Sequence, residues 1–218
     1  MKFVDFTCRK LTEEDSPDVI KFIETYFSPR CIATQIFKLN AQMESNFTRV
    51  RAKTVIQYNV SLGVFDTKGK LVRVNMARMQ KKNETCHYPT TIGKDCPQQQ
   101  AHMRFYDCLH NDLFDKLGAN KLMFLCMDTC HPDYHGQRLW KKMRIYELFE
   151  SFARENECDY LISSGVNIYI QKILKEAGFS MIREIKYSEY VDPITGCKPD
   201  LHLSEIHTSA MVMCKKVA

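Results

Sequence analysis

Side chains that can bind ligands or transfer protons gather between residues 126 and 138. Imidazoles and a carboxylate on a buried strand can take up protons, and a guanidinium can bind a phosphate. A structural zinc site normally shows paired cysteine spacing, and the sequence contains no Cys-x-x-Cys pair. The cluster therefore favours proton transfer or anion binding over a metal site. Its members are Cys126, Asp128, Cys130, His131, Asp133, His135 and Arg138.

A strand, a tight turn and a helix are predicted to position these groups. Residues 122–130 are mostly apolar without helical period, His131-Pro132-Asp133 interrupts the run, and Gly136 lies in the turn. The next residues predict one amphipathic helix. The N–H groups of a helix's first turn have no partners within it, so this turn is a candidate seat for a phosphate. The expected buried side is Leu139, Met143, Leu148 and Phe149, and the expected wet side is Lys141, Lys142 and Arg144.

The segment 130–137, Cys-His-Pro-Asp-Tyr-His-Gly-Gln, resembles the approach to the cofactor loop of the GNAT acetyltransferase superfamily. Within that superfamily the chain looks most like the insect-type arylalkylamine N-acetyltransferases. The similar stretches are I-Y-E-L-F-E-S-F-A-R-E-N at 145–156, K-I-L-K-E-A-G-F at 172–179 and A-M-V-M-C-K-K at 210–216. The resemblance extends over nearly the whole chain.

The resemblance implies an acetyl-CoA-dependent N-acetyltransferase that acts on a small primary amine by direct attack on the thioester. The backbone N–H of Asp128 would face the thioester carbonyl, the loop Gly136 to Trp140 would hold the pyrophosphate, and a carboxylate would act as base. Asp128 and Glu24 are the carboxylates nearest the expected site. The expected cofactor-binding residues are Asp128, Thr129, Cys130, His135, Gly136, Gln137, Arg138, Leu139, Trp140 and Asn167.

The chain departs from the family in the cofactor loop and at the position of the catalytic base, among other places. The family's loop pattern is [Arg/Gln]-x-x-Gly-x-[Gly/Ala], but His135, Arg138 and Trp140 stand at its first, Gly and last positions. Arg30 or Cys31 stands where the insect-type enzymes carry a catalytic glutamate. These departures leave a second hypothesis open: a catalytically silent GNAT-fold protein that acts as a binding or regulatory module.

Each unusual residue also has an ordinary interpretation. Arg138 either contacts a phosphate or projects into solvent, and Trp140 is either a core anchor or a side chain that crowds the cofactor. Glu24 fits the solvated face of a helix equally well, and His131 and His135 fit surface turn residues. The sequence alone does not choose among these roles.

Composition narrows the class of protein. The 218 residues fit a single GNAT-like domain, 1–218, and the net charge of +5 includes no long basic run, so we expect no nucleic-acid partner. No apolar run is long enough for a signal peptide or a membrane span, which predicts a cytoplasmic protein with no membrane partner. Ten cysteines without regular spacing are expected to be reduced thiols. We expect a monomer or weak dimer.

The order of the predicted elements is typical of a mixed α/β fold, the GNAT order, with a central, mostly antiparallel mixed sheet flanked by helices. Strands are expected at 3–9, 55–62, 71–76, 122–130, 159–164, 181–190 and 208–217, helices at 17–27, 36–43, 102–117 and 167–177 besides the one after Gly136, and a long loop at 80–100.

Overall fold

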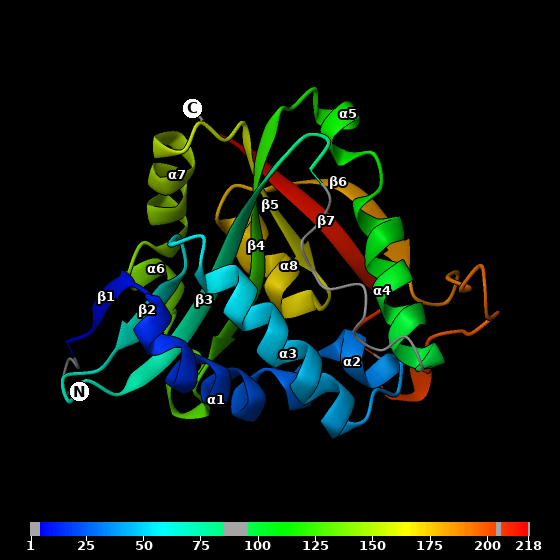
Figure 1. The fold of residues 1–218 in the computed structure, drawn as a ribbon, viewed down its shortest axis with the longest axis horizontal. Helices are drawn as coiled ribbons and strands as arrows, with labels where there is room; N and C mark the ends of the chain where they lie inside the picture. The colour runs from blue at the N-terminus through cyan, green and yellow to red at the C-terminus, as the bar shows by residue number, and fades with distance from the viewer. Residues whose placement is uncertain (1–4, 85–95, 204–205, 218) are drawn as a thin grey trace.

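The computed structural model describes residues 5–84, 96–203 and 206–217. Within these residues seven strands form one mixed sheet in the order β1-β2-β3-β4-β5-β7-β6 (Figure 1). Neighbouring strands are antiparallel except β4 and β5, which pair in parallel. This architecture confirms the predicted fold class. The strands are β1 (Thr7–Lys10), β2 (Leu62–Phe65), β3 (Leu71–Lys81), β4 (Lys121–Cys130), β5 (Tyr160–Gly165), β6 (Ser180–Lys186) and β7 (Ser209–Lys216).

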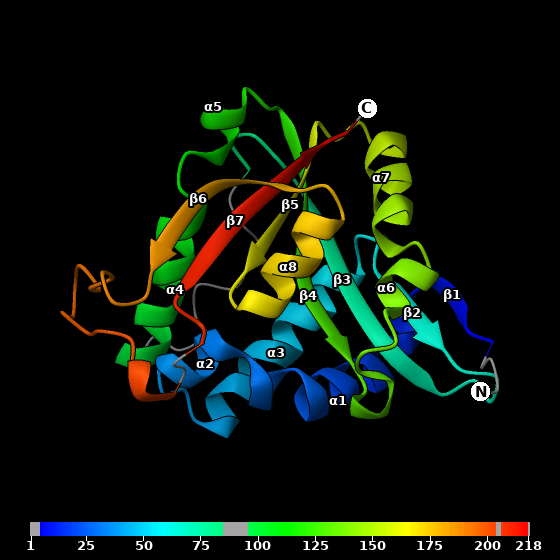
Figure 2. The same ribbon diagram turned by 180° about the vertical axis from the view of Figure 1, so that it is seen from behind.

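Helices cover both faces of the sheet. Helices α1 to α4 lie on the face nearer the viewer in Figure 1, and α6 to α8 lie on the opposite face, which Figure 2 brings forward. The helices are α1 (Ser16–Tyr26), α2 (Ile32–Ile36), α3 (Ala41–Ile56), α4 (Pro97–His110), α5 (Leu113–Leu117), α6 (Leu139–Lys142), α7 (Ile145–Glu155) and α8 (Ile168–Glu176). In the described part of the chain, no helix has the length and apolarity needed to span a membrane.

The apolar core is divided by the sheet. On one face α7 and α8 pack through residues such as Phe149 and Leu174, and on the other α1 and α3 pack around Ile23 and Val55. A third cluster joins α2 and α4 to the far end of the sheet around Phe105. The burial of apolar surface on both faces is the main force that fixes the strands relative to the helices.

The parallel pair β4 and β5 separates partway along its length. The two strands pair from Leu122 opposite Tyr160 as far as Leu125 opposite Ser163, and β4 then continues for five more residues. At this point Cys126 forms a bulge, because Leu125 lies opposite Ala77 and Met127 opposite Met76 on β3. A bulge bends a strand and increases its twist. The bulge therefore coincides with the opening between β4 and β5.

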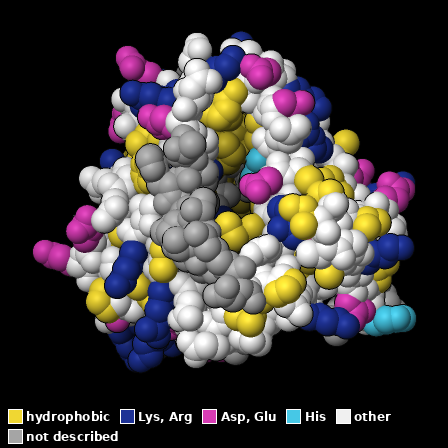
Figure 3. Space-filling view, turned by 45° about the vertical axis from the view of Figure 1, so that its right-hand side comes forward, with side chains coloured by type: hydrophobic (Ala, Val, Ile, Leu, Met, Phe, Trp, Pro, Cys, Tyr) yellow, Lys and Arg dark blue, Asp and Glu magenta, His cyan; other side chains and the backbone are white. Residues whose placement is uncertain are grey.

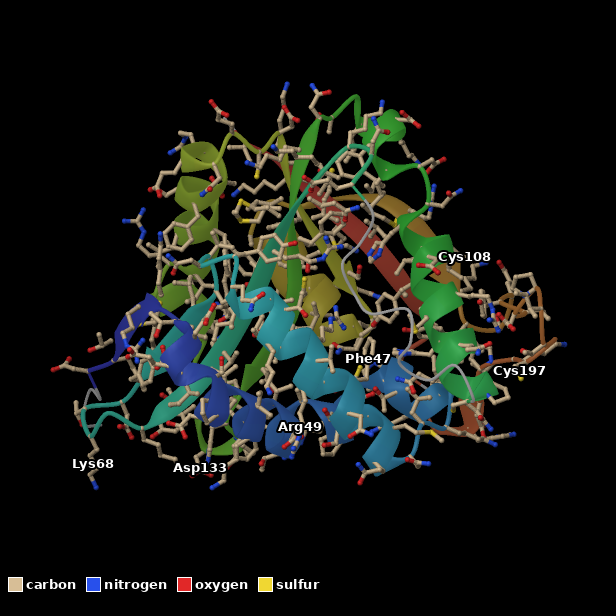
Figure 4. All side chains as sticks on the ribbon, viewed as in Figure 1. Phe47, Arg49, Lys68, Cys108, Asp133 and Cys197 are labelled. Atoms are coloured by element: carbon tan, nitrogen blue, oxygen red, sulfur yellow. The ribbon has the colours of Figure 1, made fainter. Side chains whose placement is uncertain are left out.

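Several sequence predictions agree with these elements. The Ser16-Pro17 start predicts α1, the strand at 122–130 corresponds to β4, and the helix at 167–177 corresponds to α8. Pro17 stands in the first turn of α1, where a missing N–H costs nothing. Asp66 closes the turn of the β2–β3 hairpin by accepting hydrogen bonds from the N–H groups of Lys68 and Lys70. Lys68 marks the tip of this hairpin in Figure 4.

Two predictions near the N-terminal half were wrong. The helix expected at 36–43 is interrupted, because Lys38 adopts φ 53° and Asn40 caps a new helix by accepting from the Met43 N–H. The strand expected at 55–62 is wrong in its first part, because Val55 and Ile56 form the last turn of α3. Their apolar side chains face the α1–α3 cluster. Tertiary packing, rather than β propensity, decides their conformation.

The predicted limits of two helices were also wrong. The helix expected at 102–117 begins earlier, at Pro97, and is broken by Asp112 with φ 55°. The single helix expected after Gly136 is divided into α6 and α7 by Arg144 with φ 51°. A left-handed residue cannot continue a right-handed helix. Part of the loop expected at 80–100 belongs to β3, which runs to Lys81, and residues 85–95 lie outside the described residues.

Candidate active site

One large cavity of about 1160 Å³ occupies the opening between β4 and β5. It is lined from both faces of the sheet, so we distinguish two sides. The α4 side is formed by Phe47, Arg51, His102, Tyr106 and His110, and the α8 side by His135, Gly136, Arg138, Trp140, Tyr146, Ile170 and Ile173. Figure 3 shows a hollow in the molecular surface with apolar side chains above and below it. The volume is sufficient for an elongated ligand.

The loop predicted to hold a pyrophosphate lies on the α8 side. Arg138 has φ 53°, the left-handed conformation that glycine adopts without strain. The chain thus keeps a glycine-like backbone at the position where the family pattern has glycine. Gly136 has open space around the position of an added Cβ. Within the described residues, the backbone N–H groups of Gly136, Arg138, Leu139 and Trp140 donate to no protein acceptor.

The side chains of this loop have different roles. Arg138 is 61% exposed and its Nη2 lies 3.4 Å from Oε2 of Glu176 on α8, so it does not simply project into solvent. Trp140 is buried in the core and packs edge-on against Tyr146 at 5.7 Å. Its indole is therefore a core anchor that also lines the cavity. Leu139 is fully buried beside it.

Asp128 lines the cavity but is held in an ion pair. Nη2 of Arg73 lies 2.5 Å from both carboxylate oxygens of Asp128, and the Arg73 side chain is 7% exposed. Arg73 also donates through Nε to Asn75. The pair lies close to Tyr146, whose phenol pKa is raised by burial and by the Asp128 charge. The Arg73 guanidinium thus contacts both oxygens of the Asp128 carboxylate.

The remaining strand residues and Asn167 also border the cavity. Thr129 is buried, and burial raises the pKa of the Cys130 thiol, so this thiol is not an activated nucleophile. Asn167 caps α8 by accepting from the N–H of Ile170 at 2.9 Å. His135 places Nε2 3.0 Å from the carbonyl oxygen of Cys130. Gln137 does not line the cavity, and its amide donates to the carbonyl of Asp133.

Glu24 lies away from the cavity. Its carboxylate accepts from Nε of Arg49 at 2.7 Å and from the hydroxyl of Ser45 at 2.5 Å, both on α3. These hydrogen bonds, with Arg49 first, lower the pKa of Glu24. In Figure 4 Arg49 lies low on the molecule, along the α1–α3 surface. The structure thus does not bring Glu24 together with Asp128.

The position of the family's catalytic glutamate is occupied by residues that line the cavity but supply no carboxylate. Arg30 ends a short 3-10 turn, and Cys31 is buried. Burial, followed by the nearby Glu44, raises the pKa of the Cys31 thiol. This thiol is therefore not an activated base or nucleophile. Among the described residues no cluster of three or more metal-ligating side chains occurs.

The α4 side contains polar groups that the sequence reasoning did not select. His102, Tyr106 and His110 follow one another at intervals of four residues, so they share one face of α4, and all three line the cavity. Neighbouring rings in this row lie 5.2 Å and 5.9 Å apart. The interval of four was the signal available in the sequence, but which way the face points depends on how α4 packs.

His110 is linked to the end of β5. Its Nε2 lies 2.7 Å from the hydroxyl of Ser164, the residue after the last parallel pair of β4 and β5. Burial, then the charges of Arg78 and Arg51, lower the pKa of His110 to about 3. The imidazole is therefore neutral and offers one N–H donor and one nitrogen that accepts hydrogen bonds. The pair lies where the strands separate, on the α4 side.

The fold of the chain is similar to several solved structures. An insect putative arylalkylamine N-acetyltransferase 7 from the yellow fever mosquito matches with TM-score 0.81 and 16% identity, covering 98% of this chain and 88% of that one. The C-terminal condensation domain of Ebony, in complex with β-alanyl-dopamine, matches with TM-score 0.80 and 14% identity, covering 99% and 100%. Drosophila melanogaster polyamine N-acetyltransferase, which forms N-acetylagmatine, matches with TM-score 0.79 and 13% identity, covering 97% and 100%.

No protein-family model matches the chain, and no curated protein sequence matches it significantly. At 13–16% identity the structural matches define the fold. The chain has the GNAT fold in the form found in insect arylalkylamine N-acetyltransferases. The resemblance predicted from the strand, turn and helix around His131 is confirmed at the level of the fold.

Proposed function

We propose that the chain is an acyl-CoA-dependent N-acyltransferase that acetylates a primary amine. The observation that supports this proposal most strongly is the single cavity lined from both faces of the sheet where β4 and β5 separate. A donor on the α8 side and an amine on the α4 side can meet there. The transfer then needs no covalent enzyme intermediate, because the two substrates are held in contact.

The α8 side has the groups needed to hold coenzyme A. The four N–H groups of Gly136, Arg138, Leu139 and Trp140 are suited to pyrophosphate oxygens, and the guanidinium of Arg138 adds a charged donor. The helix that follows has only four residues, so the loop N–H groups, rather than a helix dipole, would carry the binding. The edge of β4 from Asp128 to Cys130 and Asn167 would line the pantetheine arm.

The cosubstrate would supply an activated acyl thioester, and the chain would position the amine and take its proton. The amine nitrogen forms the new C–N bond as the C–S bond breaks, and the sulfur leaves as the thiolate. We assign the proton to the Ser164–His110 pair, whose atoms are 2.7 Å apart at the end of β5. Asp128 then has a structural role through Arg73, and the proposal gives Glu24 no catalytic role.

Product analysis tests this function directly. Purified protein is incubated with acetyl-CoA and a panel of primary amines in reducing buffer, and mass spectrometry detects N-acetylated amines. We expect enzyme-dependent acetylation of at least one amine. Absence of product from the whole panel, with no binding of acetyl-CoA, would favour the silent GNAT-fold module instead.

A further inference from the structure

His102 is a buried side chain whose hydrogen-bonding capacity is not used by the described residues. It is 3% exposed, lines the α4 side of the cavity, and neither Nδ1 nor Nε2 has a hydrogen-bond partner among residues 5–84, 96–203 and 206–217. Buried polar groups in proteins are hydrogen-bonded in the large majority of cases, and an unsatisfied one costs stability. An exception that faces a cavity indicates a partner that comes from the cavity.

The walls around His102 are aromatic. Phe37, Phe47 and Tyr106 place their rings 5.6, 6.2 and 5.2 Å from the imidazole, mostly edge to face. Phe47 lies between α3 and α4 in Figure 4. These ring contacts fix the imidazole and offer its nitrogens no strong acceptor or donor. The side chain is thus oriented before any ligand arrives.

The imidazole is also neutral. Burial, followed by the charge of Arg51, lowers the pKa of His102 to about 3. A neutral imidazole offers one N–H donor and one acceptor nitrogen. The same burial penalises a charged group on the ligand. The chemistry that fits is therefore a neutral group that both donates and accepts, such as a hydroxyl or an amide.

The position of His102 on α4 fixes its distance from His110. His102 and His110 are eight residues apart on one helix, which corresponds to about 12 Å along its axis. His110 contacts Ser164, where the strands separate. A ligand whose one end is at Ser164 would reach His102 with its other end, passing Tyr106 between them.

We propose that His102 is a specificity-determining residue that binds a neutral hydrogen-bonding group at the far end of the amine substrate. The substrate class is a primary amine with a hydroxyl or amide at its opposite end and an apolar middle. This inference rests on the proposed function, because the amine end is assigned to the Ser164–His110 pair.

The test compares matched substrates with matched variants. Linear α,ω-amino alcohols of increasing length are compared with the alkylamines of equal length, for the wild type and for His102→Leu. At one length we expect the wild type to favour the amino alcohol at least tenfold in kcat/KM, because an unpaired buried imidazole rejects the analogue without the hydroxyl. His102→Leu should remove this preference mainly through KM, and His102→Asn should restore part of it.

Gln99 provides the control. It lies on the same helix and is 2% exposed, and its Nε2 also has no partner in the described part of the chain, but it does not line the cavity. Gln99→Leu should leave the preference of the wild type unchanged. A preference that is absent from the wild type, or that persists in His102→Leu, would overturn the assignment.

A binding measurement separates this inference from the proposed function. The amino alcohol of the best length should raise the melting temperature of the wild type but not that of His102→Leu. If no amine is acetylated and this difference is still observed, the proposed function fails and the role of His102 stands. If the amino alcohol stabilises both proteins equally or neither, the inference is wrong.

Discussion

The two sides of the cavity present their polar groups by different means. On the α8 side the groups suited to bind phosphate belong mostly to the backbone, and Arg138 keeps the left-handed conformation although it is not glycine. On the α4 side the groups are side chains, the buried His102 and the half-buried His110, and both are partly or wholly removed from water. A backbone site tolerates changes of side chain, whereas a site of buried side chains does not.

The difference fits a loop whose side chains depart from the family pattern while Arg138 keeps a glycine-like backbone. Trp140 fills the core with its indole, and its backbone N–H donates to no acceptor among the described residues. The contrast predicts large changes in stability or turnover where buried charges or imidazoles are replaced. It predicts small changes in stability where loop side chains are replaced. The following experiments test that contrast, beginning with the largest effect.

The buried ion pair at the edge of the α8 side should dominate stability. Arg73→Ala leaves the Asp128 carboxylate without its partner, and breaking a buried pair in this way costs about 3–5 kcal/mol in the free energy of unfolding. Urea unfolding of the two proteins measures the change. In the exposed pair of Arg9 and Asp15, Arg9 is 47% exposed, and Arg9→Ala should cost less than about 1 kcal/mol. Equal losses in both variants would refute the structural role of Asp128.

The polar pair on the α4 side should dominate turnover. Ser164→Ala and His110→Phe each disrupt the pair to which we assign the proton, and general-base catalysis contributes about 10²-fold or more to the rate. Steady-state kinetics should show this loss in kcat, while calorimetry shows unchanged affinity for acetyl-CoA. The double variant should be no slower than either single variant, since the two residues act as a unit. If the losses of kcat in the two single variants added up in the double variant, the two residues would not act as a unit.

Stability should depend on pH through the buried imidazoles. The folded chain holds His102 and His110 with a pKa of about 3, because of burial and then nearby arginines, whereas the unfolded chain exposes them at about 6.5. Below about pH 6.5 the unfolded chain binds more protons, so the free energy of unfolding falls as the pH is lowered from about 7 to 5. Urea titrations at several pH values measure this slope.

His102→Leu should flatten that slope, since the variant has one buried imidazole fewer. The exposed His202 is the matched control, and His202→Leu should retain the slope of the wild type. A wild-type stability that is constant between about pH 7 and 5 would contradict the neutral, buried state of the two histidines.

The smallest effect on stability is expected in the loop. A left-handed conformation costs about 1–2 kcal/mol for a residue with a Cβ, so Arg138→Gly should be more stable than Arg138→Ala by about 1 kcal/mol. Both variants lose the guanidinium, and both should bind coenzyme A more weakly by about 1.5–3 kcal/mol. Thermal unfolding and calorimetry measure the two quantities. Arg144, with φ 51°, is a control for the backbone effect, because it does not line the cavity.

Local signals in the sequence were sufficient for much of the fold. The Ser16-Pro17 start of α1 and the turn at Gly69 are determined by backbone chemistry within a few residues. The helix break at Lys38 was not predicted, because a left-handed residue other than glycine gives no signal in the sequence. Val55 was assigned to a strand, because an alternating apolar pattern fits a buried helix end as well as a strand.

The candidate site depended more on contacts between distant residues. The loop 135–140 was found from its motif, but the partner of Asp128 is Arg73, 55 residues away, and no local pattern connects them. The separation of Glu24 from the cavity likewise follows from its contact with Arg49 on another helix. The row of His102, Tyr106 and His110 is visible as spacing, yet only the packing of α4 turns it toward the cavity.

The central claim is that the cavity binds coenzyme A although Arg138 and Trp140 depart from the family pattern. Calorimetric titration of the wild-type protein with acetyl-CoA, in buffer that keeps the free cysteines reduced, tests it most directly. We predict saturable binding at one site per chain with a dissociation constant of about 1–100 μM. The absence of any heat of binding up to millimolar acetyl-CoA would contradict the account.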